Sequence, residues 1–133
     1  MALSAGAFSM QSSELAKTRA TSPALKQFAE LESEEQRAVM QALQIVGVPL
    51  PSAVQLPAEK AEMLRRLQAA SGAEFDRMYL AGQVAGHQEL LQLHIAAAGN
   101  SPTPGERAIS TVAVPAIRSH MAWLQGVQAQ MRG

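Results

Sequence analysis

The chain has 133 residues, no cysteine, and 11 basic against 11 acidic side chains, so its formal net charge is zero. This length predicts a single domain over residues 1–133. The balanced charge, without a basic patch, argues against a nucleic-acid partner. The apolar runs are too short to span a membrane, and the lack of cysteine excludes disulfides and thiolate chemistry.

Four long helices and one short helix are predicted. The first spans roughly 3–20, and the second spans roughly 23–46 with Ser22 as its N-cap and Pro23 at its first position. The stretch VPLPSAVQLP then predicts an extended connection. A short helix follows at about 58–70, on which Glu62 and Arg66 are spaced to pair.

Ser71 and Glu74 have the spacing of a capping box that opens a third long helix, roughly 72–98. The stretch GNSPTPG ends this helix at Gly99, and the fourth long helix spans roughly 105–131, with a kink expected at Pro115. Short connections make each pair of long helices an antiparallel hairpin. The predicted fold is all-α, a ferritin-like antiparallel four-helix bundle with a long crossover containing a short extra helix. The alternative is a simple up-down bundle with an additional helix.

Two histidines lie on the apolar face of the third long helix. His87 and His94 are two turns apart and in line with Asp76 and Gln83. A rise of about 10 Å over two turns prevents the two rings from sharing one ion. His87 lies near mid-helix and is the better candidate for a site, whereas His94 is interpreted as a satisfied core histidine. The neighbouring Gly82-x-x-x-Gly86 pattern indicates close helix packing or, second, space for a ligand.

Helical wheels place polar side chains of the other long helices among apolar residues as well. His120 is close in level to His87 across the last connection, so side chains of one hairpin can meet those of the other. The predicted buried polar centre consists of Gln11, Glu32, Glu35, Gln36, Gln83, His87 and His120.

Buried polar groups of this kind require partners. A Glu–His hydrogen-bonded network that fixes the helix register is one interpretation. A divalent metal site for iron, zinc or manganese, with Glu32, Glu35, His87 and His120 as ligands, is another. The chain contains no Glu-x-x-His, which argues strongly against oxygen-activating di-iron chemistry.

The favoured functional hypothesis is a non-enzymatic binding or stress-related domain. The alternative is a metal-binding or redox enzyme with its Glu/His site inside the bundle. A third hypothesis is an interaction protein that works through an exposed helix face. A small ligand, a protein partner and an oligomer are all compatible with the sequence.

Three stretches resemble the bacterial domain-of-unknown-function 4142 family: QSSELAKTRATSPALKQFAE (11–30), SGAEFDRMYLAGQVAGHQELLQLH (71–94) and VPAIRSHMAWL (114–124). The resemblance implies a ferritin-like fold and export, hence a periplasmic or secreted location after removal of a leader, with Met1 then supplied for expression. A cytoplasmic location is the alternative.

The resemblance also implies where a family site would lie. The family's acidic-His pair on the second helix matches Glu35-Gln36, where the histidine is missing. The pair on the third helix matches Gly86-His87, where the acid is missing, and the family's last histidine matches His120. The family implies no particular reaction.

Overall fold

A computed structural model describes residues 2–132 of the chain. Within these residues the secondary structure is entirely helical, as predicted. Every helix boundary lies within two residues of its predicted position. The helices are α1 (Ala2–Arg19), α2 (Pro23–Ile45), α3 (Ala58–Ala69), α4 (Gly72–Asn100) and α5 (Pro104–Arg132).

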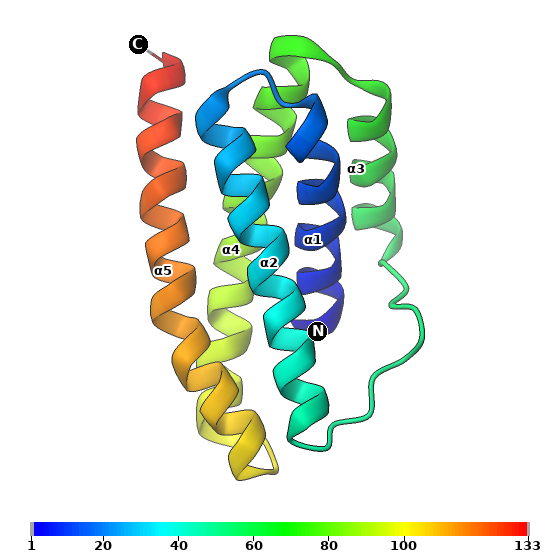
Figure 1. The fold of residues 1–133 in the computed structure, drawn as a ribbon, viewed down its shortest axis with the longest axis vertical. Helices are drawn as coiled ribbons and strands as arrows, with labels where there is room; N and C mark the ends of the chain where they lie inside the picture. Colours follow the sequence, from blue (N-terminus) through cyan, green and yellow to red (C-terminus); the bar gives the residue numbers. More distant parts are fainter. Residues whose placement is uncertain (1, 133) are drawn as a thin grey trace.

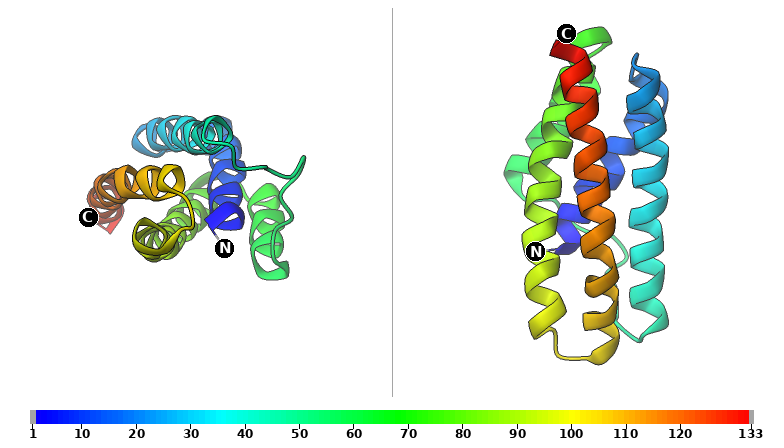
Figure 2. Two further views of the ribbon diagram at one scale, coloured as in Figure 1. Left: turned by 90° about the horizontal axis from the view of Figure 1, so that it is seen from below. Right: turned by 90° about the vertical axis from the view of Figure 1, so that its left-hand side faces the viewer.

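The four long helices form a bundle of two antiparallel hairpins (Figure 1). Helix α1 packs on α2 and α4 packs on α5, while contacts of α1 with α4 and of α2 with α5 close the bundle. The connection over residues 46–57 returns the chain from the lower end of α2 to α3. The end view in Figure 2 places α3 outside the four-helix arrangement, where it contacts α1 and α4. This topology is the predicted bundle with a long crossover and a short extra helix.

Local signals account for most of the helix boundaries. The Ser22 hydroxyl accepts a hydrogen bond from the Leu25 amide at 3.3 Å, and Pro23 occupies the first position of α2, as predicted. Glu62 and Arg66 pair at 3.2 Å on α3, also as predicted. Helix α5 continues through Pro115.

The predicted capping box at Ser71 and Glu74 is wrong. Ser71 is the N-cap of α4, but its side chain makes no capping hydrogen bond. The backbone enters the helix through Gly72 in a left-handed conformation, with φ +61°, and the Glu74 carboxylate pairs with an arginine one turn further on. The N-terminus of α5 is capped instead by Thr103, whose hydroxyl accepts from the Glu106 amide at 3.2 Å. The same hydroxyl donates to the Glu106 carboxylate at 3.1 Å, in place of the backbone amide that donates in a reciprocal capping box.

A buried carboxylate ties the turn between α1 and α2 to the start of α4. Asp76 is 4% exposed and accepts from the Thr21 amide at 2.9 Å and from the Thr21 hydroxyl at 2.5 Å. It also accepts from the Ser22 amide at 3.0 Å. Asp76 therefore fixes one hairpin of the bundle against the other at this end.

The apolar core is divided into two clusters. The larger lies toward the α1–α2 turn and consists of Ala16, Ala20, Leu25, Phe28, Ala29, Leu67, Phe75, Tyr79, Leu80, Leu124 and Val127. The smaller lies toward the α4–α5 connection and consists of Ala5, Leu90, Ala113 and Ile117. Fully buried polar side chains lie on the helices between the two clusters, so the bundle has a polar layer near mid-height.

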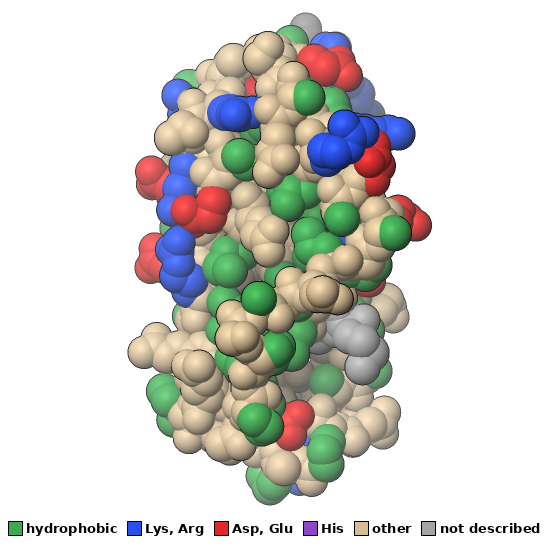
Figure 3. All heavy atoms as spheres, turned by 90° about the vertical axis from the view of Figure 1, so that its right-hand side faces the viewer, with side chains coloured by type: hydrophobic (Ala, Val, Ile, Leu, Met, Phe, Trp, Pro, Cys, Tyr) green, Lys and Arg blue, Asp and Glu red, His purple; other side chains and the backbone are tan. Residues whose placement is uncertain are grey.

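The face that carries α3 has an uneven charge distribution. Charged side chains gather on its upper part, whereas apolar and uncharged side chains cover most of its lower part (Figure 3). Helix α3 carries exposed charged side chains, including the Glu62–Arg65 pair at 2.5 Å. Among residues 2–132, no helix is both long and apolar enough to cross a membrane.

Candidate functional site

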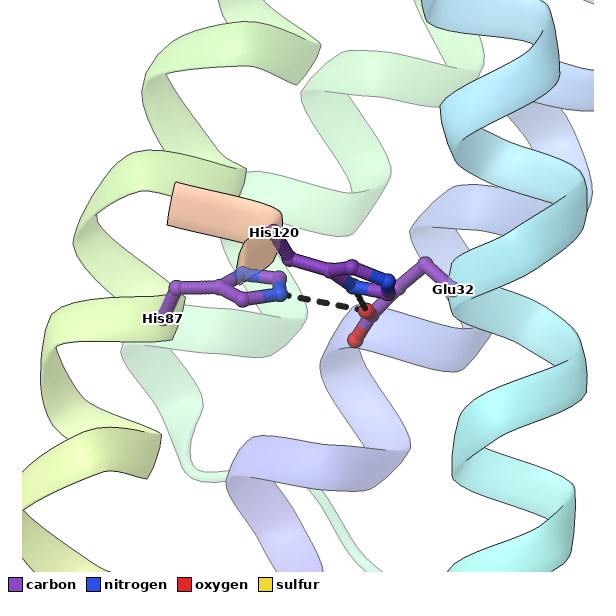
Figure 4. A group of neighbouring side chains, drawn as sticks. All are labelled: Glu32, His87 and His120. Carbon is purple, nitrogen blue, oxygen red and sulfur yellow. Dashed lines mark hydrogen bonds and ion pairs between the residues drawn. The ribbon is translucent and has the colours of Figure 1, made fainter. Parts of the chain in front are cut away.

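The polar layer is organised around the carboxylate of Glu32 on α2, whose side chain is 0% exposed. Its Oε1 lies 3.1 Å from His87 Nε2 on α4 and 2.8 Å from His120 Nδ1 on α5 (Figure 4). Its Oε2 accepts from the Ser9 hydroxyl at 2.6 Å and from the Gln36 amide at 2.9 Å. A single buried carboxylate therefore connects side chains from all four helices of the bundle.

His87 is held by its other ring nitrogen. Its Nδ1 lies 2.8 Å from the backbone carbonyl of Gln83, one turn earlier on α4. A carbonyl only accepts, so the ring proton of neutral His87 lies on Nδ1. The Nε2 lone pair then faces the Glu32 oxygen, and this approach is repulsive unless a positive charge lies between the two atoms. Either a second ring proton or a metal cation supplies that charge.

His120 completes the group from α5. Its Nδ1 lies 2.8 Å from Glu32 Oε1 and 3.1 Å from Glu35 Oε2, and its side chain is 14% exposed. The His87 and His120 rings lie 5.8 Å apart. The buried ring of Phe28 packs against both, with centroids 5.6 Å from His87 and 5.2 Å from His120. Phe28 therefore shields the two imidazoles on the side of the larger apolar cluster.

The surroundings shift the pKa values of Glu32 and Glu35 in opposite directions. Burial disfavours the charge on Glu32, but hydrogen bonds from His120 and His87 outweigh burial and hold the pKa of its carboxyl well below the usual range. Burial raises the pKa of Glu35, and the neighbouring charge of Glu32 adds to this rise. Burial also opposes protonation of His120, but the hydrogen bond to Glu32 and the charge of Glu35 outweigh it and raise the pKa of the imidazole.

Glu35 has an oxygen without a hydrogen bond. Its Oε2 is buried and has no hydrogen-bond partner, although it lies at ion-pair distance from His120. Buried carboxylate oxygens normally accept hydrogen bonds, so an orphaned one calls for an explanation. A cation near His120 would provide one.

A second set of polar groups supports the centre from α1 and α4. The Ser9 hydroxyl lies 2.9 Å from the side-chain oxygen of Gln83, and the Gln83 amide donates to Ser12 at 2.8 Å. Ser12 in turn lies 2.7 Å from the backbone carbonyl of Phe8. This network fixes the α4 turn whose carbonyl orients His87.

The residues of the predicted polar centre differ in burial and in their hydrogen bonds to Glu32. Gln36, Gln83 and His87 are buried and belong to the network around Glu32. Gln11 is only partly buried and takes no part in the hydrogen bonds found among the described residues. His94 is buried but lies outside this network, with its Nδ1 2.9 Å from the Ser110 hydroxyl.

Sequence reasoning missed Ser9 and Ser12, which are each 1% exposed. The buried face of α1 consists largely of small residues, and Ala5, Ser9, Ser12 and Ala16 recur at helical spacing along it. That stripe of small residues was the available signal. It is weaker than an apolar stripe of leucines because alanine and serine occur on exposed helix faces as well.

The two glycines before His87 have different surroundings. A Cβ on Gly82 would lie 3.7 Å from the Phe8 ring and from the Met63 methyl, so this glycine packs closely against α1 and α3. Gly86 is buried, yet a Cβ there would meet no atom within 4 Å. The predicted close packing thus applies to Gly82 alone.

Glu32, His87 and His120 each offer a ligand atom, and these atoms lie within 4.8 Å of one another. Glu35, the fourth member of the predicted ligand set, is not part of this group. Two imidazoles and one carboxylate form a donor set that suits divalent transition metals. In His87, the hydrogen bond from Nδ1 to a backbone carbonyl is the arrangement that fixes the tautomer of a metal-binding histidine.

A protein-family model described as "Domain of unknown function (DUF4142)" matches residues 1–127. The matched range includes Glu32, His87 and His120. No curated protein and no solved structure matches the chain.

Proposed function

The chain belongs to the DUF4142 family of unknown function, and for this member we propose a non-enzymatic role in which Glu32, His87 and His120 bind one divalent metal ion. The observation that carries this proposal is the geometry of His87. Its Nδ1 proton is committed to the Gln83 carbonyl, and its Nε2 lies 3.1 Å from Glu32 Oε1. A cation between Nε2 and the carboxylate removes the repulsion without requiring a second proton on the buried ring.

The surroundings of His120 add support. Its Nδ1 approaches the same Glu32 oxygen, so both imidazoles converge on one point inside the bundle. The orphaned Glu35 oxygen, 3.1 Å from His120 Nδ1, would gain a favourable interaction with a nearby cation. Nitrogen and oxygen donors together favour zinc or iron, and manganese is compatible with the carboxylate.

Several features favour binding over catalysis. A cavity of about 360 Å³ toward the α4–α5 connection is lined by none of the three proposed ligands. Phe28 covers both imidazoles. A catalytic metal needs an open coordination position that a substrate can reach, whereas Glu32 and His87 are fully buried and His120 is only 14% exposed. The sequence also lacks the Glu-x-x-His motif of di-iron carboxylate enzymes.

A purely structural network is the second candidate, and the four hydrogen-bonding contacts of Glu32 favour it. In that case a proton, in place of a metal ion, lies between His87 Nε2 and the Glu32 carboxylate. A satisfied network of this kind would specify the packing of the four helices. The two candidates differ in what occupies the space between the imidazoles and the carboxylate, a metal ion or protons.

Calorimetric titration of the chelator-treated, dialysed chain with Zn²⁺, Mn²⁺ or anaerobic Fe²⁺ distinguishes them. We expect one ion per chain and release of protons on binding, measured in buffers with different ionisation enthalpies. His87→Gln and His120→Gln should each weaken binding by more than about 100-fold, the upper end of the effect of losing an outer hydrogen-bond partner.

His94→Gln is the matched control, because it removes another buried histidine of α4 that lies outside the group. It should leave the stoichiometry and the affinity unchanged. If none of the three ions binds with a stoichiometry of one, or if His94→Gln weakens binding as much as His87→Gln does, the metal proposal is wrong.

We also propose that the protein is exported in bacteria and acts in the periplasm or outside the cell. The resemblance of residues 11–30, 71–94 and 114–124 to a family with mostly exported members supports this location. Expression of the gene together with the sequence upstream of Met1, followed by periplasmic extraction, tests it. Retention of the protein with a cytoplasmic marker enzyme would contradict export.

A further inference from the structure

A second region of the bundle has the features of a ligand site. A cavity of about 360 Å³ lies toward the α4–α5 connection, away from the larger apolar cluster. Helices α1, α2, α4 and α5 all contribute to its lining. Its walls are largely apolar, with side chains that include Leu3, Val39, Leu43, Leu93 and Ile109.

The cavity is partly open to solvent, and its volume suits a small ligand. Small-molecule sites have volumes of about 300–1,000 Å³. The volume here lies at the lower end of that range.

A few polar groups interrupt the apolar lining. His94 and Ser110 both line the cavity, and the distance between His94 Nδ1 and Ser110 Oγ is 2.9 Å. Gln36 lines the same cavity. Neutral His94 has one donor and one acceptor nitrogen, and no hydrogen bond to its Nε2 is found within residues 2–132. A hydroxyl group can donate as well as accept, so it can pair with Nε2 in either tautomer.

The charges around the cavity disfavour an anionic ligand. Burial lowers the pKa of His94, so the ring is neutral at physiological pH. The carboxylate-bearing Glu106 also belongs to the lining. No lysine or arginine contributes to the described lining, so a ligand carboxylate or sulfonate would find no positive partner there.

We propose that this cavity binds an uncharged small molecule with an apolar body, whose hydroxyl end lies against His94 and Ser110. The proposal is independent of the metal site, since none of Glu32, His87 and His120 lines the cavity. Gln36 does connect the two regions, because it lines the cavity and donates to Glu32 at 2.9 Å.

Fluorescence titration of the complete chain with 1-anilinonaphthalene, an uncharged reporter of apolar sites, tests the proposal. We expect saturable binding of one reporter per chain. In competition, 1-heptanol should displace the reporter at a concentration at least about tenfold lower than the concentration of heptanoate that has the same effect. A tenfold difference corresponds to about 1.4 kcal/mol in binding free energy. The two competitors have the same chain length and differ in the charge of the polar end.

A matched pair of variants locates the binding. Ala97 lines the cavity, whereas the adjacent Ala96 is exposed on α4. Ala97→Phe fills the cavity and should weaken reporter binding by at least about tenfold, whereas Ala96→Phe should leave it unchanged. Absence of saturable binding, equal effects of the two variants, or equal competition by heptanoate and 1-heptanol would each overturn the proposal.

Amide chemical shifts of the ¹⁵N-labelled wild-type chain provide a readout that does not depend on how the variants fold. Addition of 1-heptanol should shift the amides of Gly6, Ala97 and Ser110, which line the cavity. Shifts confined to the neighbourhood of the exposed apolar side chains Ile45 and Val112, which are 78% and 69% exposed, would contradict the cavity as the site.

Discussion

Replacement of Glu32 by methionine removes the acceptor that four groups share. The Glu32 carboxylate interacts with His87, His120, Ser9 and Gln36 at distances between 2.6 and 3.1 Å. Each buried donor left without an acceptor costs roughly 1–3 kcal/mol. The summed cost of these unpaired donors is partly offset, because the substitution also removes a buried charge and lets the imidazoles lose a proton. Breaking buried ion pairs has a net cost of roughly 3–5 kcal/mol, and we expect a loss of that size here.

Urea unfolding followed by circular dichroism, in chelator so that metal binding does not contribute, measures this loss. A decrease of roughly 3–5 kcal/mol is a large part of the 5–15 kcal/mol by which domains are typically stable. Glu34→Met is the control, because Glu34 lies on the same helix with an exposed side chain. If both variants change the free energy of unfolding by less than about 0.5 kcal/mol, the usual range for surface substitutions, Glu32 does not organise the bundle.

Three further predictions concern other positions in the bundle. The folded chain raises the pKa of His120, so the stabilisation that protonated His120 provides is complete below pH 6.5 and is lost as the pH rises through the raised pKa. In chelator, the free energy of unfolding of wild type should therefore fall above the raised pKa, relative to that of His120→Gln. Gly86→Ala should stabilise the chain by up to about 1 kcal/mol in thermal unfolding, because a Cβ there meets no atom and alanine favours helix. Gly6→Ala should lack this gain, since its Cβ would lie 2.7 Å from the Gln36 side-chain oxygen. Asp76→Ala should lower the free energy of unfolding by roughly 2–4 kcal/mol through the loss of hydrogen bonds to a charged acceptor, and it should increase hydrogen exchange at the Thr21 amide.

The helices and their order followed from local signals. Proline, glycine and serine mark several of the helix ends, and short connections leave antiparallel packing as the one way to bury the apolar faces. The burial of His87 followed from the helical wheel, because its position on the apolar face of α4 is set by sequence spacing alone.

The details of the site depended on tertiary contacts that spacing does not determine. Glu32 and Glu35 both fall on the inner side of α2, but only Glu32 is fully buried between both imidazoles. Which of two carboxylates one turn apart becomes the shared acceptor depends on the rotation of α2 against α4 and α5. On α1, small side chains make up much of the buried face, and Ser9 rather than Gln11 reaches the centre.

The predicted capping box at Ser71 failed for a related reason. Ser-x-x-Glu spacing permits a reciprocal box only if the chain enters the helix in a suitable conformation. Here the chain enters α4 through the left-handed Gly72, and the Ser71 side chain makes no capping hydrogen bond.

Elemental analysis of protein purified without chelator tests the central claim most directly. Wild type and Glu34→Gln should each contain one equivalent of zinc, iron or manganese per chain, and Glu32→Gln should contain none, since it replaces the carboxylate on which His87 and His120 converge by a neutral amide. A metal-free wild type that also remains metal-free after incubation with each of these ions would contradict the account. Metal content that is the same in Glu32→Gln and in Glu34→Gln would contradict it as well.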